Sequence, residues 1–272
     1  MLILENIEIV VIASILCFVV YQNAKKFGIN QYNPFIKLKP LSEREEAILA
    51  HNFVIYDRLP DAYRNKCNER IVWFRSKKRF VFYGEVAKTE ELRLILSATA
   101  AFMLLGLSNY RMHRSLFRVI VYPSSYYSKV NRRYHLGEYN PKFKTLVLSA
   151  DKIWEGFKIP DDNRNLAIHE FAHALSFEML KKRSWEARRF RVGLRKIREL
   201  FEKRSFRQKL VSTQYFREYG LTNLHEFFSV AVENYFETPS KFHRDFPELF
   251  DIIQRMLNFD YEISCVFDPP KT

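Results

Sequence analysis

The sequence predicts an α+β domain that is mostly helical and contains a small sheet. Segments with apolar residues at helical spacing outnumber the runs typical of strands, and the strand-like runs are short. The 272 residues are 47% hydrophobic and 28% charged, which is the composition of a globular chain rather than a disordered one. This length suits one sizeable core, or at most two small domains.

An uncharged apolar run, IVVIASILCFVVY, covers residues 9–21 near the amino end of the chain. A membrane-spanning helix needs about 20 residues, and residues 2–21 reach that length only with Glu5 and Glu8 near the membrane interface. The acidic start and the bulky end of the run do not suit a cleaved signal peptide. We therefore predict a transmembrane anchor within residues 1–24, with a hydrophobic helix packed on the domain as the alternative.

The residues after this run indicate where the rest of the chain lies. Lys25 and Lys26 follow it directly, and basic residues flanking a membrane helix stay on the cytoplasmic side. The odd number and wide spacing of the cysteines argue against a disulfide framework and against a CxxC zinc site. These are Cys17, Cys67 and Cys265. We therefore predict a cytoplasmic main domain, joined to the anchor by a linker over residues 25–40.

Helix and strand signals follow one another along the main domain. Ser42 and Glu45 form a capping-box pattern at the start of the first predicted helix. The predicted helices cover residues 43–56, 61–75, 89–107, 162–179, 224–237 and 247–257, and the predicted strands cover 79–83, 117–122 and 145–149. The polar, aromatic and basic segment between the last two strands is predicted to be a loop. Asp161 or Asp162 is expected to cap the helix that ends near Met179.

The strongest chemical motif is HEFAH at residues 169–173, which has the HExxH pattern. His169 and His173 are four residues apart on one face of a helix, so both imidazoles can reach one metal ion. Glu170 lies about 100° further around that helix, where its carboxylate can act as the general base on a metal-bound water. The motif predicts a catalytic zinc, with two surface histidines beside a glutamate as the structural alternative.

A catalytic zinc needs a third protein ligand and an open position. Met179 stands where the extended three-histidine motif would place its last histidine, so that type of site is excluded. The apolar helix LHEFFSVAVE offers Glu226 and Glu233 on roughly one face, with His225 beside them. Burying a carboxylate is costly unless it has a partner such as a metal. Spacing alone leaves the choice between the two glutamates open.

Four segments resemble the MtfA-type peptidases, the glucose-regulated metallopeptidases of the gluzincin type. They are NLAIHEFAHAL, HEFFSVAVENYFETP, RVIVYPSSY and ILSATAAFMLLGL, and the resemblance covers most of residues 41–260. It implies that Glu226 is the third zinc ligand and that Tyr219, seven residues earlier, donates to the oxyanion. The arrangement is also similar to the catalytic domain of anthrax lethal factor, but Val230 replaces its acidic residue four positions after the glutamate ligand. For Glu233 we predict a polar or capping contact.

These features predict a zinc-dependent peptidase domain over residues 41–262, holding one Zn²⁺ per chain and followed by a tail over 263–272. The substrate would be a peptide or protein, and the resemblance to gluzincins implies that the strand at residues 145–149 pairs with an extended substrate. The alternative is a non-catalytic module on the same fold that binds a regulator protein.

A basic segment carries most of the excess positive charge. The formal net charge is +13, and residues 181–209 contain 13 Lys or Arg against three Glu. Apolar residues recur there at helical spacing, which predicts a basic amphipathic helix. The helix could pack on the domain or lie on an anionic membrane surface. Nucleic-acid binding has no motif to support it.

Overall fold

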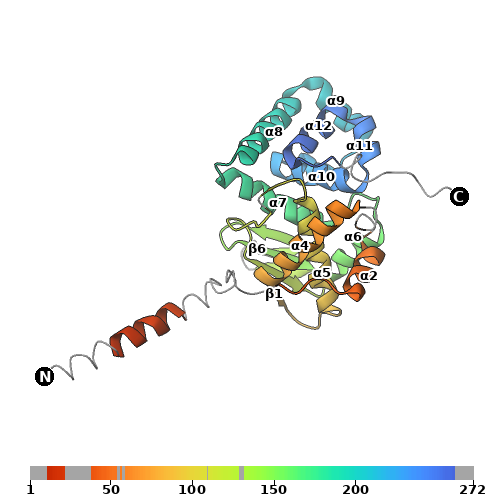
Figure 1. The fold of residues 1–272 in the computed structure, drawn as a ribbon. Coiled ribbons are helices and arrows are strands. Elements are labelled where there is room, and N and C mark those ends of the chain that lie inside the picture. Colours follow the sequence, from red (N-terminus) through yellow and green to blue (C-terminus); the bar gives the residue numbers. More distant parts are fainter. Residues whose placement is uncertain are drawn as a thin grey trace. The chain divides into compact units, whose positions relative to one another are not determined.

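The computed structural model describes residues 11–21, 38–53, 56, 59–108, 110–128 and 132–260. The chain divides into two compact units, residues 1–39 and 40–272. The second unit, drawn in Figure 1, is mostly helical and contains a small mixed sheet. The predicted fold class is therefore confirmed.

Residues 11–21 of the first unit form a helix whose side chains are exposed. The remaining residues of the predicted anchor, 1–10 and 22–24, lie outside the described residues. In the part of the chain that the structure describes, no helix combines the length and the apolar character needed to cross a bilayer. The anchor, and the cytoplasmic location inferred from it, stay predictions.

Among the described residues, the second unit begins with α2 (Glu43–Asn52) and α4 (Asp61–Lys77), and α5 (Thr89–Met103) follows after a short strand. The predicted capping box is present at the start of α2, where the Glu45 N–H donates to Ser42 Oγ and the Ser42 N–H donates to the Glu45 carboxylate. Most side chains of α5 are buried, as its apolar sequence predicts, and α5 packs against α4 and α2.

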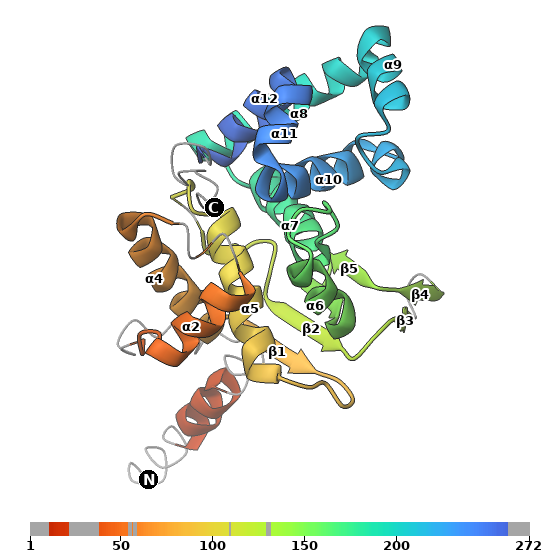
Figure 2. The ribbon, with the colours of Figure 1, turned by 90° about the vertical axis from the view of Figure 1, so that its right-hand side faces the viewer.

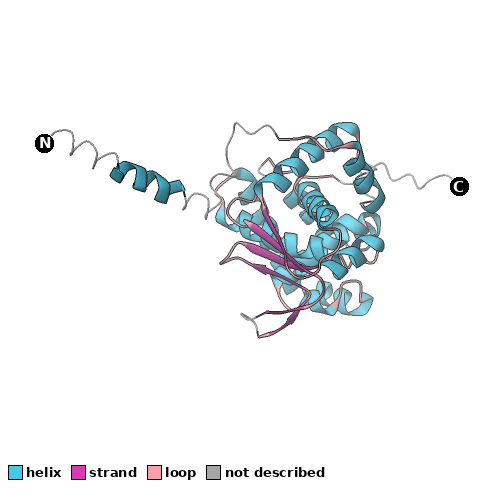
Figure 3. Ribbon diagram, turned by 90° about the horizontal axis from the view of Figure 1, so that it is seen from below, coloured by secondary structure: helices cyan, strands magenta, loops and turns pink. Residues whose placement is uncertain are grey.

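The main sheet has four strands in the order β1, β2, β6, β5. They span Arg79–Phe82, Arg118–Tyr122, Thr145–Ser149 and Gly137–Asn140 respectively. β1, β2 and β6 are parallel, and β5 pairs antiparallel with β6. A separate pair joins β3 (Tyr126–Ser128) to β4 (Arg133–His135). The strands, magenta in Figure 3, gather at one side of the domain.

The sheet corrects two expectations from the sequence. The segment predicted as a loop contains β3, β4 and β5, which are too short and too polar to show an apolar strand pattern. β6, the strand expected to pair with substrate, is bonded on one side to β2 and on the other to β5. Its backbone donors and acceptors are therefore used inside the sheet, and β5 lies at the sheet's edge.

Helices dominate the rest of the domain. They are α6 (Ala150–Lys158), α7 (Leu166–Lys181), α8 (Trp185–Glu202), α9 (Arg204–Thr213), α10 (Leu224–Glu237), α11 (Pro239–Asp245) and α12 (Pro247–Leu257), with a 3₁₀ turn, η2, at Glu218–Leu221. α10 and α12 have the predicted bounds. α7 starts later than predicted because Asn165, and neither Asp161 nor Asp162, caps it by accepting the Ile168 N–H. Figures 1 and 2 show α7 between the sheet and the C-terminal helices.

The basic segment forms α8 and α9. The apolar face of α8 is buried in the domain, where the helix packs mainly on α12 and α7. Phe190 of α8 meets Phe228 of α10 edge to face, with ring centroids 5.2 Å apart. The exposed face carries cations such as Arg188, Arg195 and Arg198. The sequence allowed this helix to pack on the domain, and its apolar side does so.

Candidate metal centre

The HExxH motif lies in the second and third turns of α7, a helix that is buried along most of its length. The side chains of Phe171 and Leu175 are in the core, which fixes the rotation of the helix about its axis. The four-residue spacing then places the rings of His169 and His173 on one face, with their centroids 4.9 Å apart. His169 and Glu170 are each only 6% exposed.

α10 brings a carboxylate to the same point. Asn223 caps this helix by accepting the N–H groups of His225 and Glu226, each at 3.0 Å. The cap fixes the first turn of α10, and α10 packs along α7. Glu226 Oε2 lies 3.1 Å from His169 Nε2 and 3.4 Å from the Nε2 of the other motif histidine.

These three donors fit a single metal ion. The two imidazole Nε2 atoms lie 3.2 Å apart, so the three distances among the donors run from 3.1 to 3.4 Å. Ligands about 2.0–2.1 Å from a tetrahedral zinc lie about 3.3–3.4 Å from one another. Among the described residues, His169, His173 and Glu226 are the group of potential ligands whose donor atoms all lie within 4.8 Å of one another. The neighbouring His225 is exposed and lies outside this group.

A cleft of about 360 Å³ opens beside these donors. Its walls come from β4, β5, α7 and the start of α10. They include Gly137, Tyr139, Glu170, His173, Phe177 and Glu226. Glu170 therefore faces the same space as His173 and Glu226, which a general base must do.

Gly137 on β5 allows the edge strand to approach α7 closely. A Cβ at this position would lie 2.9 Å from Glu170 Oε1 and 2.7 Å from Leu166 Cδ1, so any larger residue would displace one of them. The sequence analysis did not select this glycine. Its signal, a glycine that interrupts a strand where another element comes close, was hidden because the strand itself was not predicted.

Glu233 makes a polar contact, as predicted, and its partner is one of the candidate ligands. Its Oε1 lies 2.7 Å from His169 Nδ1, and its Oε2 accepts the Asn165 N–H at 2.9 Å. Arg217 forms an ion pair with the same carboxylate, which is fully buried. Seven residues are about two helical turns, so Glu233 lies on the same face as Glu226.

His173 also has a polar partner at Nδ1, the ring nitrogen that faces away from the other candidate ligands. Ser229 Oγ lies 3.2 Å from His173 Nδ1. Each imidazole therefore has a partner at Nδ1 and directs Nε2 toward the third donor. Partners of this kind set the tautomer and the orientation of metal-binding histidines.

The charges around the donors favour a cation at their centre. Burial alone lowers the pKa of His169, but hydrogen bonds to Glu226 and Glu233 outweigh it and raise that pKa to about 10. Burial raises the pKa of Glu226, yet hydrogen bonds to the two motif histidines hold it below its usual range. Glu170 has a raised pKa, chiefly because it is buried. The site thus stabilises positive charge, which a divalent metal or a proton supplies.

Glu237, one turn beyond Glu233 on α10, is a further buried carboxyl group. Burial, and next the negative charge of Glu233, raise its pKa to about 9. An unfolded glutamate ionises at about pH 4.3, so between that pH and about 9 the folded state holds one more proton. The free energy of unfolding therefore falls as the pH rises through this window.

Replacing Glu237 with glutamine is expected to raise the free energy of unfolding at pH 8 by about 1–3 kcal/mol. It should also flatten the dependence of stability on pH. Urea unfolding at pH 5.5 and pH 8 measures both effects, with Glu202→Gln, at an exposed position, as the control. Equal pH dependence in wild type and Glu237→Gln would show that the carboxyl ionises normally in the folded chain.

Comparison with known proteins places this arrangement in a family. A sequence model described as glucose-regulated metallo-peptidase M90 matches residues 30–258. The chain belongs to this family. A relative is 25% identical over 244 residues, covering 84% of this chain and 88% of its own length. It is the uncharacterized protein slr2042 of Synechocystis sp. (strain ATCC 27184 / PCC 6803 / Kazusa).

Membership of the M90 family confirms the resemblance found in the sequence. The cluster of His169, His173 and Glu226 is consistent with a metallopeptidase site built from HExxH and a distant glutamate. The backbone of Tyr219, the expected oxyanion donor, lies in η2, but its side chain is outside the described part of the structure. The sequence assigned no carboxylate to support His169, since Val230 stands where the similar lethal-factor arrangement has an acidic residue, but the structure places Glu233 against His169 Nδ1.

Replacing Glu233 with glutamine is expected to weaken metal binding by about 10–100-fold, as loss of a carboxylate partner of a ligand histidine does elsewhere. The amide keeps the shape but loses the charge that supports His169. Competition with a chromogenic chelator gives the affinity. The matched control is Glu199→Gln on the exposed face of α8. An affinity equal to that of wild type would mean that the contact with His169 does not support the metal.

Proposed function

We propose that this M90-family chain is a zinc-dependent peptidase with one Zn²⁺ held by His169, His173 and Glu226. The observation that carries the proposal is the convergence of these three donors, 3.1–3.4 Å apart, beside a cleft that is lined by His173, Glu226 and Glu170. Two nitrogens and one carboxylate oxygen, with the fourth position open to the cleft, are the donor set of catalytic zinc sites.

When bound, zinc polarises the scissile carbonyl and lowers the pKa of a water molecule. Glu170 takes the proton of the attacking water and passes it to the leaving amine. Its burial supports this role, since the raised pKa of the carboxyl favours accepting that proton. We assign the oxyanion contact to Tyr219 because it matches the tyrosine that the family resemblance places seven residues before the glutamate ligand.

The edge strand β5 gives the cleft a place for an extended peptide. Among the described strands β5 pairs only with β6, and Gly137 and Tyr139 line the cleft beside Glu170. An extended substrate adds to such an edge through backbone hydrogen bonds. The M90 family implies a peptide or protein substrate, and this placement supports one that binds as an added strand.

A digestion of a complex peptide mixture tests the proposal. The zinc-loaded chain is incubated with peptides prepared from a whole-cell protein extract, and new termini are identified by mass spectrometry. We expect new termini that disappear after treatment with a zinc chelator and return when zinc is restored. A zinc-loaded chain that produces no new termini would support the alternative, a non-catalytic module that binds a regulator protein.

We also propose that the exposed cations of α8 and α9 contact an anionic membrane surface. The apolar side of α8 is occupied by the domain, so the contact would be electrostatic and would not insert the helix. Co-sedimentation with phosphatidylserine vesicles should therefore fall as the salt concentration rises. Binding that is independent of salt, or equal to neutral vesicles, would contradict this contact.

A further inference from the structure

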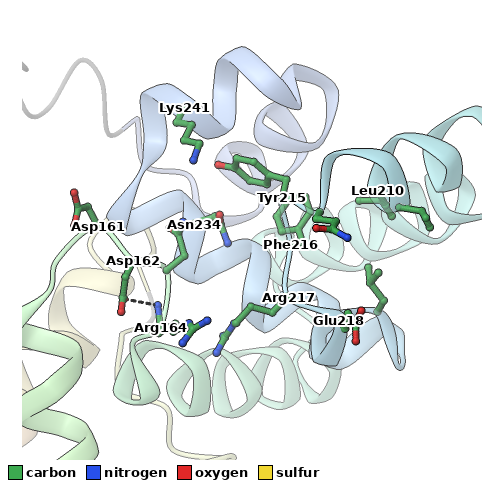
Figure 4. Close-up of a pocket in the computed structure, with 14 residues that line it drawn as sticks. Asp161, Asp162, Arg164, Leu210, Tyr215, Phe216, Arg217, Glu218, Asn234 and Lys241 are labelled. Atoms are coloured by element: carbon green, nitrogen blue, oxygen red, sulfur yellow. Dashed lines mark hydrogen bonds between the residues drawn. The ribbon is translucent and has the colours of Figure 1, made fainter.

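A second cavity lies next to the metal centre and belongs to a different part of the domain. It has a volume of about 580 Å³ and shares no lining residue with the cleft. Its walls come from residues 161–164, from the stretch that runs from the end of α9 through η2, and from α10 and α11, as Figure 4 shows. Small-molecule sites have volumes of about 300–1,000 Å³, so this cavity has room for an organic ligand larger than a single ion.

The charges that line the cavity are balanced. Three side chains are basic and three are acidic. They are Arg164, Arg217, Lys241, Asp161, Asp162 and Glu218. A simple anion would be opposed by three carboxylates and a simple cation by three basic groups. A dipolar molecule, with one charge of each sign, matches both sets.

Two buried polar atoms in this lining have no partner. Asn234 is 1% exposed and its Nδ2 donates to the Val230 carbonyl, while its Oδ1 has no hydrogen-bond partner among the described residues. The Nε of Arg217 is likewise buried and unpaired in the described part of the chain. The first atom needs a donor and the second an acceptor. An ammonium and a carboxylate on one ligand supply both.

The cavity also has an apolar side. Tyr215, Phe216, Leu210 and Leu221 contribute to its walls, and the Phe216 ring is buried. Figure 4 shows Tyr215 and Phe216 on the opposite side of the space from Arg164. Such a wall accommodates an apolar side chain next to the polar groups.

We propose that this cavity binds a free α-amino acid with an apolar or aromatic side chain. Its carboxylate pairs with the guanidinium groups of Arg217 and Arg164, and its ammonium donates to Asn234 Oδ1. The side chain packs on Phe216 and Tyr215. Balanced charge, an unpaired acceptor, an unpaired donor and an apolar wall together select this class of ligand.

The site is connected to the metal centre through one residue. Arg217 lines the cavity and pairs with Glu233 Oε1, the same oxygen that contacts His169 Nδ1. A ligand carboxylate would share the Arg217 guanidinium with Glu233. An amino acid bound here therefore changes the support of a metal ligand without entering the cleft, so the binding of amino acid and metal are coupled.

Calorimetric titration of the zinc-loaded full chain with L-phenylalanine tests the site. We expect saturable binding of one molecule per chain. N-acetyl-L-phenylalanine lacks the ammonium and L-phenylalaninamide lacks the carboxylate. The dissociation constant of each should therefore be at least about tenfold higher than that of L-phenylalanine. Either derivative binding as tightly as L-phenylalanine, or no saturable binding of the amino acid at millimolar concentration, would overturn the proposal.

Two substitutions locate the binding. Arg164→Gln, at an exposed position, should weaken binding about tenfold, whereas Arg188→Gln on the exposed face of α8 should not change it. His173→Ala removes a candidate metal ligand and should still bind L-phenylalanine, with an affinity that is changed by the loss of the coupled metal. Binding that survives Arg164→Gln but is lost in His173→Ala would place the amino acid on the metal and refute the second site. Thermal unfolding of each variant checks that it is folded.

Discussion

Replacing Glu170 with glutamine is expected to lower kcat for peptide hydrolysis by about 10²–10⁴-fold while leaving zinc bound. The residues of the motif have different roles. His169 and His173 direct their Nε2 atoms toward Glu226, whereas Glu170 lines the cleft and is not part of the ligand group. Glutamine has nearly the same shape as glutamate but cannot accept a proton from water.

The measurement combines a steady-state assay on a peptide cleaved by the wild type with metal analysis of the same samples. Glu202→Gln, at an exposed site on α8, is the control and should keep the wild-type kcat. If Glu170→Gln retained zinc and hydrolysed peptide at the wild-type rate, another group would have to be the general base. If it lost zinc, the glutamate would instead be needed for metal binding.

Replacing Glu226 with alanine is expected to abolish stoichiometric zinc binding, an effect well beyond the roughly 10–100-fold expected for residues that only support a ligand. Among the described residues, the Glu226 carboxylate is the oxygen donor that approaches the Nε2 atoms of both motif histidines, at 3.1 and 3.4 Å. Without it the two imidazoles form an incomplete site. His225→Ala is the matched control, because that side chain is adjacent in sequence, exposed and outside the ligand group.

Chelator competition and metal analysis of the two variants measure this effect. We expect Glu226→Ala to be purified with little zinc and His225→Ala with as much as the wild type. The opposite pattern would assign the third ligand to the histidine. Zinc retained in both variants would mean that a different group completes the site.

The sequence predicted the parts of the site that depend on helical periodicity. The four-residue spacing of the motif histidines and the apolar character of α7 and α10 determine which side chains share a face. The third ligand was assigned to Glu226 by the family resemblance, because the spacing of the sequence allowed Glu233 equally well. Both glutamates do lie on one face, one at the Nε2 side of His169 and the other at its Nδ1.

What the sequence did not predict depends on contacts between distant segments. β5 is short and polar, and it is a strand because it pairs with β6. A glycine is needed at position 137 only because α7 passes close beside it. Arg217 shows no motif in the sequence, yet it meets Glu233 from another element. Asn165 replaced the expected aspartates as the cap of α7 because its backbone N–H is itself held by Glu233.

We propose that His169, His173 and Glu226 together hold a zinc ion, and X-ray absorption at the zinc edge, on wild-type chain purified without added metal, tests this assignment. We expect one zinc per chain, with two imidazole nitrogens and oxygen ligands at about 2.0–2.2 Å and no sulfur. A chain that contains no stoichiometric zinc, or a spectrum with a zinc–sulfur distance of about 2.3 Å, would contradict it.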